Sequence, residues 1–361
     1  MELKQTLRRI PTLLGSARAA MAAFSARYRM PLVLLLLVGI VVFPHVITGP
    51  YYIRVATIMG IYVILASSLN IIIGFTGLFS LGHAAFYGIG AYTSALLATQ
   101  AGVSFWIALP AAGLVAAAFG ALIGVATLRL RAVFLAFTTL GFGEITRIVI
   151  LNWRSFTRGP LGIAGIPVPQ FFGTPFTRVS YWYLVAGLAV VTVLGVYRVY
   201  HSRIGRALVA IREDELAARS MGIHVFGYKV LAFTMACFFA GIAGSFFAHF
   251  QRFISADSFL NTESFTIITM VALGGTGSIV GAVVGAVILT LLPEMFRFLV
   301  EFRMVLYGLI LIMVIVLKPG GIVGVKGVFE KPKSQRKPWI VEKLTRKPTI
   351  PDATQPQGGT L

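Results

Sequence analysis

Charge and cysteine are scarce in this chain of 361 residues. Charged residues make up 12% of the sequence and hydrophobic residues 57%, which leaves too little charge to cover a water-soluble globule with a polar surface. The single cysteine, Cys237, lies in an apolar run and has no second cysteine with which to form an internal disulfide. The composition therefore indicates a polytopic membrane protein.

Catalytic motifs are missing as well. The sequence contains no Gly-x-x-x-x-Gly-Lys-Ser/Thr phosphate-binding loop, no zinc-protease helix, no Gly-x-Ser-x-Gly nucleophile turn and no pair of carboxylates within an apolar run. We therefore expect a non-catalytic chain that binds no metal or cofactor and does not hydrolyse ATP. If ATP drives its work, another polypeptide must hydrolyse it.

Long apolar runs are abundant. A transmembrane helix needs about 20 mostly apolar residues to cross about 30 Å of hydrocarbon. The candidate stretches lie near residues 31–48, 52–73, 76–98, 105–128, 132–150, 181–197, 230–250, 264–293 and 304–317. The predicted fold is thus all-α, a transmembrane helical bundle of about 8–10 spans.

The net charge of +19 is concentrated outside these apolar stretches. Basic residues gather at 1–30, 198–229 and 318–361, and the positive-inside rule assigns all three segments to the cytoplasm. Topology therefore explains the charge, with contact to anionic membrane lipid as an additional role, and nucleic acid is not an expected partner. The predicted organisation is a basic cytoplasmic arm at 1–30, a transmembrane domain at 31–318 that includes a cytoplasmic region at 203–228, and a basic, disordered cytoplasmic tail at 319–361.

Glycine interrupts two of the apolar stretches. For the tail to return to the cytoplasm, 264–293 must form two shorter helices, and Gly274–Ser278 is where the backbone can unwind. A similar Gly-x-Thr-Gly sequence, Gly74–Gly77, lies 200 residues earlier and reflects either an internal duplication or a chance match. Irregular backbone at membrane depth must be covered by protein or border a water-filled cavity, so we expect both broken-helix junctions to border a pathway through the bundle.

Placing polar residues within the membrane costs free energy, so such residues are usually functional or paired. Glu144 and Arg147 are close enough to pair on one helix face, either as a structural anchor or as part of the pathway wall. His83 lies among small residues and is either a hydrogen-bonded packing residue or a proton relay, with Ser68 and Asn70 just upstream as partners. The residues expected to line the pathway are Asn70, Gly74, Thr76, Gly77, His83, Glu144, Gly274, Gly275, Thr276, Gly277 and Ser278.

A charged island, Arg198–Lys229, separates two apolar stretches. It is rich in helix formers from Ala207 to Met221 and offers Gly222 as a stop, so we expect one short amphipathic helix there. Such a helix either presents a docking surface to a soluble partner or belongs to an ordinary solvated loop. The residues expected to make the contact are Arg212, Glu213, Asp214, Glu215, Ala217, Ala218, Met221 and Gly222.

The longest loop on the opposite side of the membrane spans residues 152–178. It combines cations, aromatic residues and turn formers. It either receives an external protein or serves as a plain connector.

Three segments of the sequence resemble one known family. Ser68–Tyr92, Gly205–Gly222 and Gly274–Ala282 are similar to the corresponding signatures of bacterial permease subunits for branched-chain amino acids, the LivM type. The resemblance covers about residues 50–325. It implies the permease of an ATP-binding cassette importer in the inner membrane, and branched-chain or related amino acids as the transported molecules.

The same resemblance implies partners. They are a second, homologous permease subunit, two cytoplasmic ATPases that use ATP and Mg, and a periplasmic substrate-binding protein. Importer permeases share a Glu-Ala-Ala-x-x-x-Gly motif whose helix docks into the ATPase, and Ala217, Ala218 and Gly222 keep its spacing. Glu215 lies one residue further upstream than that motif places its glutamate.

A different class of function stays open from the residues alone. A stand-alone secondary transporter or channel for a small polar solute, driven by an ion gradient, would place carboxylates near the middle of the membrane. Within the apolar stretches, Glu144 is the carboxylate near that depth.

Overall fold

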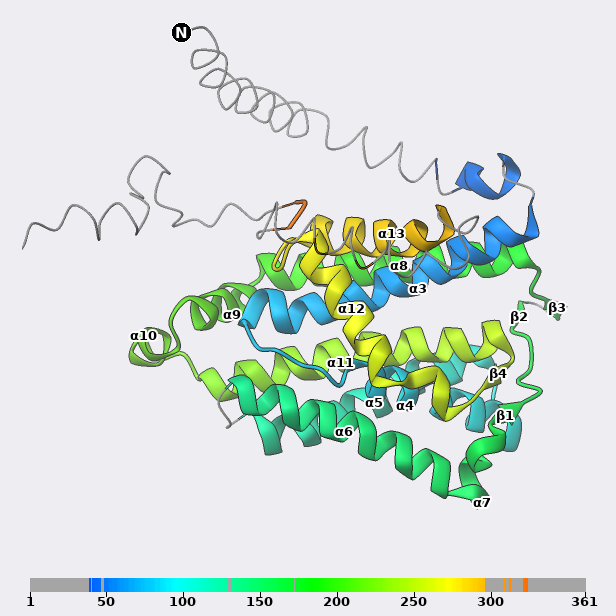
Figure 1. Ribbon diagram of the computed structural model, residues 1–361, viewed down its shortest axis with the longest axis horizontal. Helices are drawn as coiled ribbons and strands as arrows, with labels where there is room; N and C mark the ends of the chain where they lie inside the picture. The colour runs from blue at the N-terminus through cyan, green and yellow to red at the C-terminus, as the bar shows by residue number, and fades with distance from the viewer. Residues whose placement is uncertain are drawn as a thin grey trace, which may run out of the picture. The chain divides into compact units, whose positions relative to one another are not determined.

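The computed structural model describes residues 39, 41–46, 49–128, 132–171, 173–295, 308, 312 and 321–323, which form a helical bundle (Figure 1). The longer helices are α3 (Pro50–Asn70), which continues as the π-helix η1 (Ile71–Thr76), α4 (His83–Gln100), α5 (Phe105–Thr127), α6 (Ala132–Asn152), α8 (Arg178–His201), α9 (Arg203–Glu213), α11 (Val225–Gln251), α12 (Asn261–Gly274) and α13 (Ile279–Met295). The shorter elements are α7 (Arg154–Thr157), η2 (Gly159–Leu161), α10 (Glu215–Ser220), η3 (Ala256–Phe259), and the strands β1 (Ile163–Ala164), β2 (Gln170–Phe171), β3 (Thr174–Pro175) and β4 (Phe253–Ile254).

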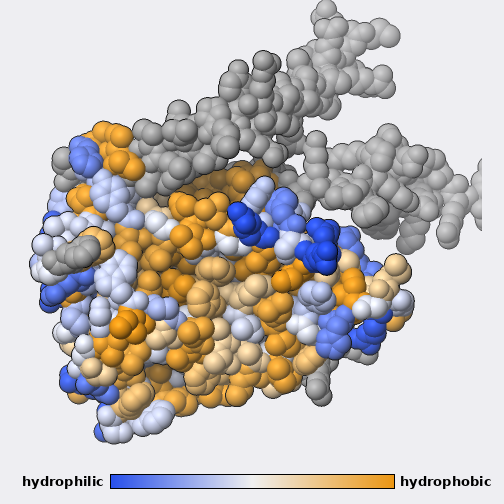
Figure 2. Space-filling model, turned by 180° about the vertical axis from the view of Figure 1, so that it is seen from behind, coloured by the Kyte–Doolittle hydropathy of each residue, from blue (hydrophilic) through white to orange (hydrophobic). Residues whose placement is uncertain are grey.

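The predicted all-α membrane fold is confirmed. Among the described residues, five helices are long and apolar enough to cross a membrane: α3 with η1, α5, most of α6, α8 and α11. The predicted spans at 31–48 and 304–317 lie outside the described residues, apart from 39, 41–46, 308 and 312, which are helical. Figure 2 shows hydrophobic residues across the middle of one face and hydrophilic residues toward its two ends, as expected for a surface that meets hydrocarbon between two aqueous layers.

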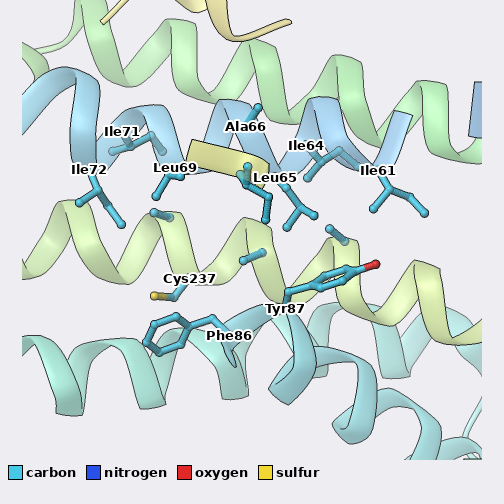
Figure 3. Packing of buried hydrophobic residues seen from close by; sticks show 14 of the residues in the cluster. Ile61, Ile64, Leu65, Ala66, Leu69, Ile71, Ile72, Phe86, Tyr87 and Cys237 are labelled. Atoms are coloured by element: carbon cyan, nitrogen blue, oxygen red, sulfur yellow. The ribbon is translucent and has the colours of Figure 1, made fainter. Parts of the chain in front are cut away.

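The helix α11 runs through the bundle and packs against α3, α4 and α5. Small residues make this close packing possible, because Ala236, Ala240 and Ala243 of α11 have no exposed surface and let neighbouring helices approach. In Figure 3, Cys237 of α11 lies between aliphatic side chains of α3 and Phe86 of α4. The cysteine is free and buried.

Gly244 lies at a close crossing of α11 and α4. A Cβ at this position would overlap the backbone carbonyl oxygen of Tyr87 and lie 2.7 Å from the backbone nitrogen of Ala91. Backbone cannot give way as a flexible side chain can, so Gly244→Ala is expected to destabilise the fold by about 1–3 kcal/mol. The measurement is the melting temperature of the purified chain, which should fall by several degrees.

Gly187→Ala on α8 is the matched control for that variant. Nothing lies within 4 Å of a Cβ built at Gly187, so its melting temperature should stay at or above that of the wild type. Equal melting temperatures for the two variants would contradict the packing described at Gly244.

Two predictions about helix breaks have different outcomes. The stretch 264–293 is broken as predicted, with α12 ending at Gly274 and α13 starting at Ile279. The predicted span at 76–98 is wrong at its start, because residues 77–82 are irregular and α4 begins only at His83. The irregular segment is held from the side, since the hydroxyl oxygen of Thr139 accepts the N–H of Leu81 at 3.0 Å.

The single helix predicted for Ala207–Met221 is also wrong. Asp214 adopts an extended backbone, and its carboxylate accepts the N–H groups of Leu216 and Ala217 at 2.9 Å each. This capping ends α9 and starts α10, so a local hydrogen bond overrides the helix propensity of the flanking residues. Figure 1 shows the two helices at one end of the bundle, away from β1–β4.

The predicted stop at Gly222 is confirmed. Gly222 has φ +81°, a left-handed conformation that glycine adopts without a steric penalty. Its N–H donates to Arg219 at 3.0 Å, and the N–H of Ile223 donates to Ala218 at 3.1 Å. These two bonds form the Schellman motif that closes α10.

Part of the predicted disordered tail is attached to the bundle. The N–H groups of Ile322 and Val323 each donate at 2.9 Å, to the carbonyl oxygens of Leu273 and Gly274 at the end of α12. Ile322 and Val323 therefore satisfy carbonyl groups that the end of α12 leaves without a helical partner. The remainder of that tail and the basic arm at 1–30 lie outside the described residues.

The loop at the opposite end of the bundle is built into the fold. Strand β1 pairs antiparallel with β4, and Ile163 lies opposite Ile254. His249 of α11 bonds through its Nδ1 to the carbonyl oxygen of Pro167 at 2.9 Å and through its Nε2 to Ser94 at 3.0 Å. The large apolar side chains that this region exposes are Trp106, Trp153, Phe156, Leu161, Phe171 and Phe253.

Candidate functional site

The two glycine junctions predicted from the sequence lie against each other. A Cβ on Gly74 would lie 2.6 Å from the backbone nitrogen of Gly277. Asn70 joins them, because its Oδ1 accepts the N–H of Gly277 at 2.8 Å and its Nδ2 donates to the carbonyl oxygen of Ser278 at 3.2 Å. One fully buried amide thus holds α3 against the break between α12 and α13, and we name this contact the Asn70 clamp.

Arg212 connects the α9–α10 hairpin to the same place. Its Nη1 donates to the carbonyl oxygen of Gly74 at 2.6 Å. Gly74 is in the last turn of η1, where carbonyl groups have no later helical N–H to accept, so a charged side chain from α9 satisfies one of them. The sequence predicted Arg212 as a docking residue, and its role at the glycine junction needed the three-dimensional contact.

The other predicted pathway residues near this junction have local partners. Thr76 is buried and its hydroxyl donates to the carbonyl oxygen of Ile72 at 2.6 Å. Gly77 follows in a left-handed conformation, φ +71°, and lies beside the aliphatic part of Arg212. The Asn70 clamp holds the broken-helix segment between α12 and α13. This segment contains the other predicted pathway residues, Gly274, Gly275, Thr276 and Gly277.

His83 is fully buried at the first turn of α4 and reaches Ser68 of α3, with Nε2 to Oγ at 2.9 Å. The Ser68 hydroxyl donates to the carbonyl oxygen of Leu65, so the His83 Nε2 is the donor to Ser68. Among the described residues, His83 Nδ1 has no hydrogen-bond partner. A proton relay needs partners on both ring nitrogens, so this geometry favours the packing interpretation over the relay.

The predicted ion pair of Glu144 and Arg147 is present, with Arg147 Nη2 to Glu144 Oε1 at 2.7 Å. The pair extends across elements, because Arg147 also lies 3.8 Å from Asp257 and Asn261 donates to Glu144 at 3.4 Å. These contacts attach α6 to η3 and to the first residue of α12. They favour the structural interpretation of the pair, with the role in the pathway wall remaining a prediction.

A second carboxylate within the bundle was missed by sequence reasoning. The Tyr62 hydroxyl of α3 donates to Glu263 Oε2 at 3.1 Å, and Glu263 is half-buried. Glu263 stands one residue before the apolar stretch predicted at 264–293, so hydropathy placed it outside the membrane. The structure instead places it beside the middle of α3.

The α9–α10 hairpin offers two large apolar side chains to solvent. Leu216 is 74% exposed and Met221 83% exposed, although charged residues surround them in sequence. Of the other predicted docking residues, Ala218 is buried beside Ile211 and Val225, and the exposed ones are Arg212, Glu213, Asp214, Glu215, Ala217 and Gly222. Sequence reasoning did not predict Leu216 as a docking residue. The sequence signal that could have found it is its position directly before Ala217 and Ala218.

Glu215 has a partner within the chain. Its Oε2 lies 2.6 Å from Nζ of Lys229, whose side chain is only 8% exposed at the start of α11. Arg219 approaches the other oxygen at 3.6 Å. Glu215 therefore fastens α10 to α11.

Metal binding has no visible basis in this part of the chain. Within the described ranges, no group of three or more His, Cys, Asp or Glu side chains could hold a metal ion. The polar residues that do come together there form hydrogen bonds between helices and ion pairs.

Comparison with known proteins identifies the family. Residues 51–315 match the model of the family described as branched-chain amino acid transport system / permease component. The chain is 42% identical to the high-affinity branched-chain amino acid transport system permease protein LivM of Salmonella typhimurium, over 74% of this chain and 69% of the relative. The Escherichia coli LivM protein shows the same identity and coverage.

More distant relatives extend the comparison. A probable branched-chain amino acid transport permease protein LivM of Methanocaldococcus jannaschii is 21% identical over 77% of this chain and 94% of its own. The autoinducer 2 import system permease protein LsrC of an Enterobacter species is 28% identical over 58% of this chain and 63% of its own. No solved structure matches the chain. Because several of its helices are long and apolar enough to cross a membrane and the family model matches residues 51–315, the chain is a multi-pass membrane protein and belongs to the branched-chain amino acid transport permease family.

Proposed function

We propose that this chain is a permease subunit of an ATP-binding cassette importer that moves branched-chain or related amino acids across the bacterial inner membrane. The LivM relatives, which are named as permeases for branched-chain amino acids, support the substrate class. The observation that carries the coupling part of the proposal is the α9–α10 hairpin. One side of it exposes Leu216 and Met221, and another side contacts the glycine junction through Arg212.

The proposed assembly contains a second homologous permease, two cytoplasmic ATPases and a periplasmic substrate-binding protein. The ATPases bind and hydrolyse ATP with Mg, and this chain performs no chemistry. Both ends of the chain and the α9–α10 hairpin lie in the cytoplasm, because basic residues gather in those three segments. The loop at 152–178 then faces the periplasm.

Movement would pass from the ATPases to the pathway by direct contact. An apolar surface that is exposed on an otherwise charged hairpin fits a groove on a protein partner. When ATP binding brings the ATPases together, α10 moves with them, and the Schellman turn and Glu215–Lys229 pair keep α10 joined to α11. Arg212 then moves the carbonyl end of η1, and the Asn70 clamp transfers that shift to the α12–α13 break.

The test is co-purification in mild detergent from the native cell. We expect the ATPases to purify with the wild-type chain and to fall by roughly tenfold or more with a Leu216→Asp, Met221→Asp double variant, because anchors at the centre of an interface carry most of its binding free energy. Leu161→Asp is the matched control, since Leu161 is an equally exposed leucine, 81%, at the opposite end of the bundle. Equal recovery of ATPases from all three chains, or none with the wild type, would contradict the proposal.

A further inference from the structure

Glu263 lies inside the bundle, and none of the cationic side chains of the described residues forms an ion pair with it. It is in the first turn of α12, which begins beside the middle of α3 instead of at an end of the bundle. The neighbouring Ser264 is fully buried and accepts the N–H of Ala84 at 2.8 Å, which fixes the start of α12 within the bundle. A carboxylate at such a depth is costly and is normally paired.

The ion pairs of the described residues leave Glu263 out. They join Arg147 to Glu144 and Asp257, and Glu215 to Arg219 and Lys229. The hydrogen bond from Tyr62 and the positive end of the α12 dipole partly offset the charge of Glu263. Both favour the ionised carboxylate and oppose the effect of burial, which disfavours it, and a cation beside Glu263 would favour the ionised form further.

The surroundings of Glu263 suit an organic ammonium group. Tyr87 of α4 lies close enough to interact electrostatically with both Tyr62 and Glu263. The Tyr87 ring packs edge to face on Phe259, with centroids 5.1 Å apart, and against Phe247 at 5.4 Å. Carboxylate oxygens together with aromatic rings are the groups that bind a desolvated ammonium most strongly.

A polar stripe leads from Glu263 along α12. Thr262 is exposed, and Thr266 and Thr269, which follow at helical spacing on the same face, are half-buried. The hydroxyl of Thr266 donates to the carbonyl oxygen of Thr262 at 3.0 Å, and the threonines make this face of α12 more polar than a face of aliphatic side chains. The stripe runs toward Gly274, where the Asn70 clamp holds the helix end.

We propose that Glu263 and Tyr62 form a transient binding site for the α-ammonium group of the transported amino acid. The site is at one end of α12 and the clamp reached by Arg212 is at the other. A movement of the hairpin can therefore reposition the helix that holds the ammonium group. This inference rests on the proposed function and names the substrate group that the pathway recognises.

The test uses the complete importer in proteoliposomes, with leucine uptake and ATP hydrolysis measured together. Glu263→Gln should lower leucine uptake per ATP hydrolysed by roughly tenfold or more, while ATP hydrolysis stays within about twofold, because a charged partner of the ammonium is lost. Tyr62→Phe keeps the carboxylate and should lower the same ratio by about three- to tenfold. The control is Glu294→Gln. Glu294 is also a half-buried glutamate and accepts a hydrogen bond from a tyrosine hydroxyl, that of Tyr51, but it lies near the C-terminal end of α13. It should leave the ratio unchanged.

Two results would overturn the ammonium site. The first is a Glu263→Gln variant that keeps the wild-type ratio of leucine uptake to ATP hydrolysis. The second is a Glu263→Gln variant that loses uptake and ATP hydrolysis in parallel, together with an unchanged ratio in Tyr62→Phe. The second result would make Glu263 a structural residue. Failure of the wild-type importer to take up leucine with ATP would contradict the proposed function itself. The two failures are therefore distinguishable.

Discussion

Replacing Asn70 by alanine is expected to lower the free energy of unfolding by about 2–4 kcal/mol. The side chain has no exposed surface, and its amide satisfies the N–H of Gly277 and the carbonyl of Ser278. Alanine leaves both backbone groups buried without a partner and opens a small cavity between them. The measurement is denaturant unfolding of the purified chain in detergent.

Ser67→Ala is the control for the Asn70 variant. Ser67 lies one turn earlier on α3, and its buried hydroxyl has no partner among the described residues. Removing an unsatisfied polar group should leave stability unchanged or raise it slightly. If Asn70→Ala unfolded at the same denaturant concentration as Ser67→Ala, the Asn70 clamp would not hold the two junctions together.

Replacing Arg212 by glutamine is expected to uncouple the importer. ATP hydrolysis by the assembled complex should continue, while leucine import should fall by roughly tenfold or more, because the charged bond to the carbonyl of Gly74 is the link from α9 to the glycine junction. Arg212 is otherwise exposed, so the variant should fold and assemble. The measurement is the ratio of imported leucine to hydrolysed ATP in proteoliposomes.

Arg206→Gln controls for loss of a cation from the same helix. Arg206 is an exposed arginine of α9 that donates to the carbonyl oxygen of His201, at the start of the same hairpin. It should keep the wild-type ratio of import to hydrolysis. Equal ratios for the Arg212 and Arg206 variants would show that coupling does not pass through Gly74.

Sequence patterns predicted the elements that depend on local chemistry. The long apolar stretches, the helix break at Gly274–Ser278 and the stop at Gly222 all follow from hydropathy and from the backbone freedom of glycine. The division between α9 and α10 was also local, since Asp214 is a strong N-cap residue. It was missed because helix formers on both sides favoured one continuous helix.

Other features depended on contacts between distant segments. Apolar periodicity extended the predicted span at 76–98 back over residues that the structure holds as an irregular segment on α6. Nothing in the sequence near Arg212 points to Gly74, and nothing near Glu263 points to Tyr62. The Gly-x-Thr-Gly pattern shared by the two glycine junctions was the one sequence signal that linked them. Asn70, whose amide joins the two junctions, was predicted as a pathway residue and not as the link between them.

We propose that this chain imports amino acids only when partner ATPases drive it. The measurement that tests this is leucine accumulation in proteoliposomes that contain either the complete assembly with ATP or this chain alone with a proton or sodium gradient. We expect accumulation by the complete assembly, dependent on ATP hydrolysis, and none by the chain alone. Accumulation driven by an ion gradient in the absence of the ATPases would contradict it and would make Glu144 and Glu263 the residues of a stand-alone transporter.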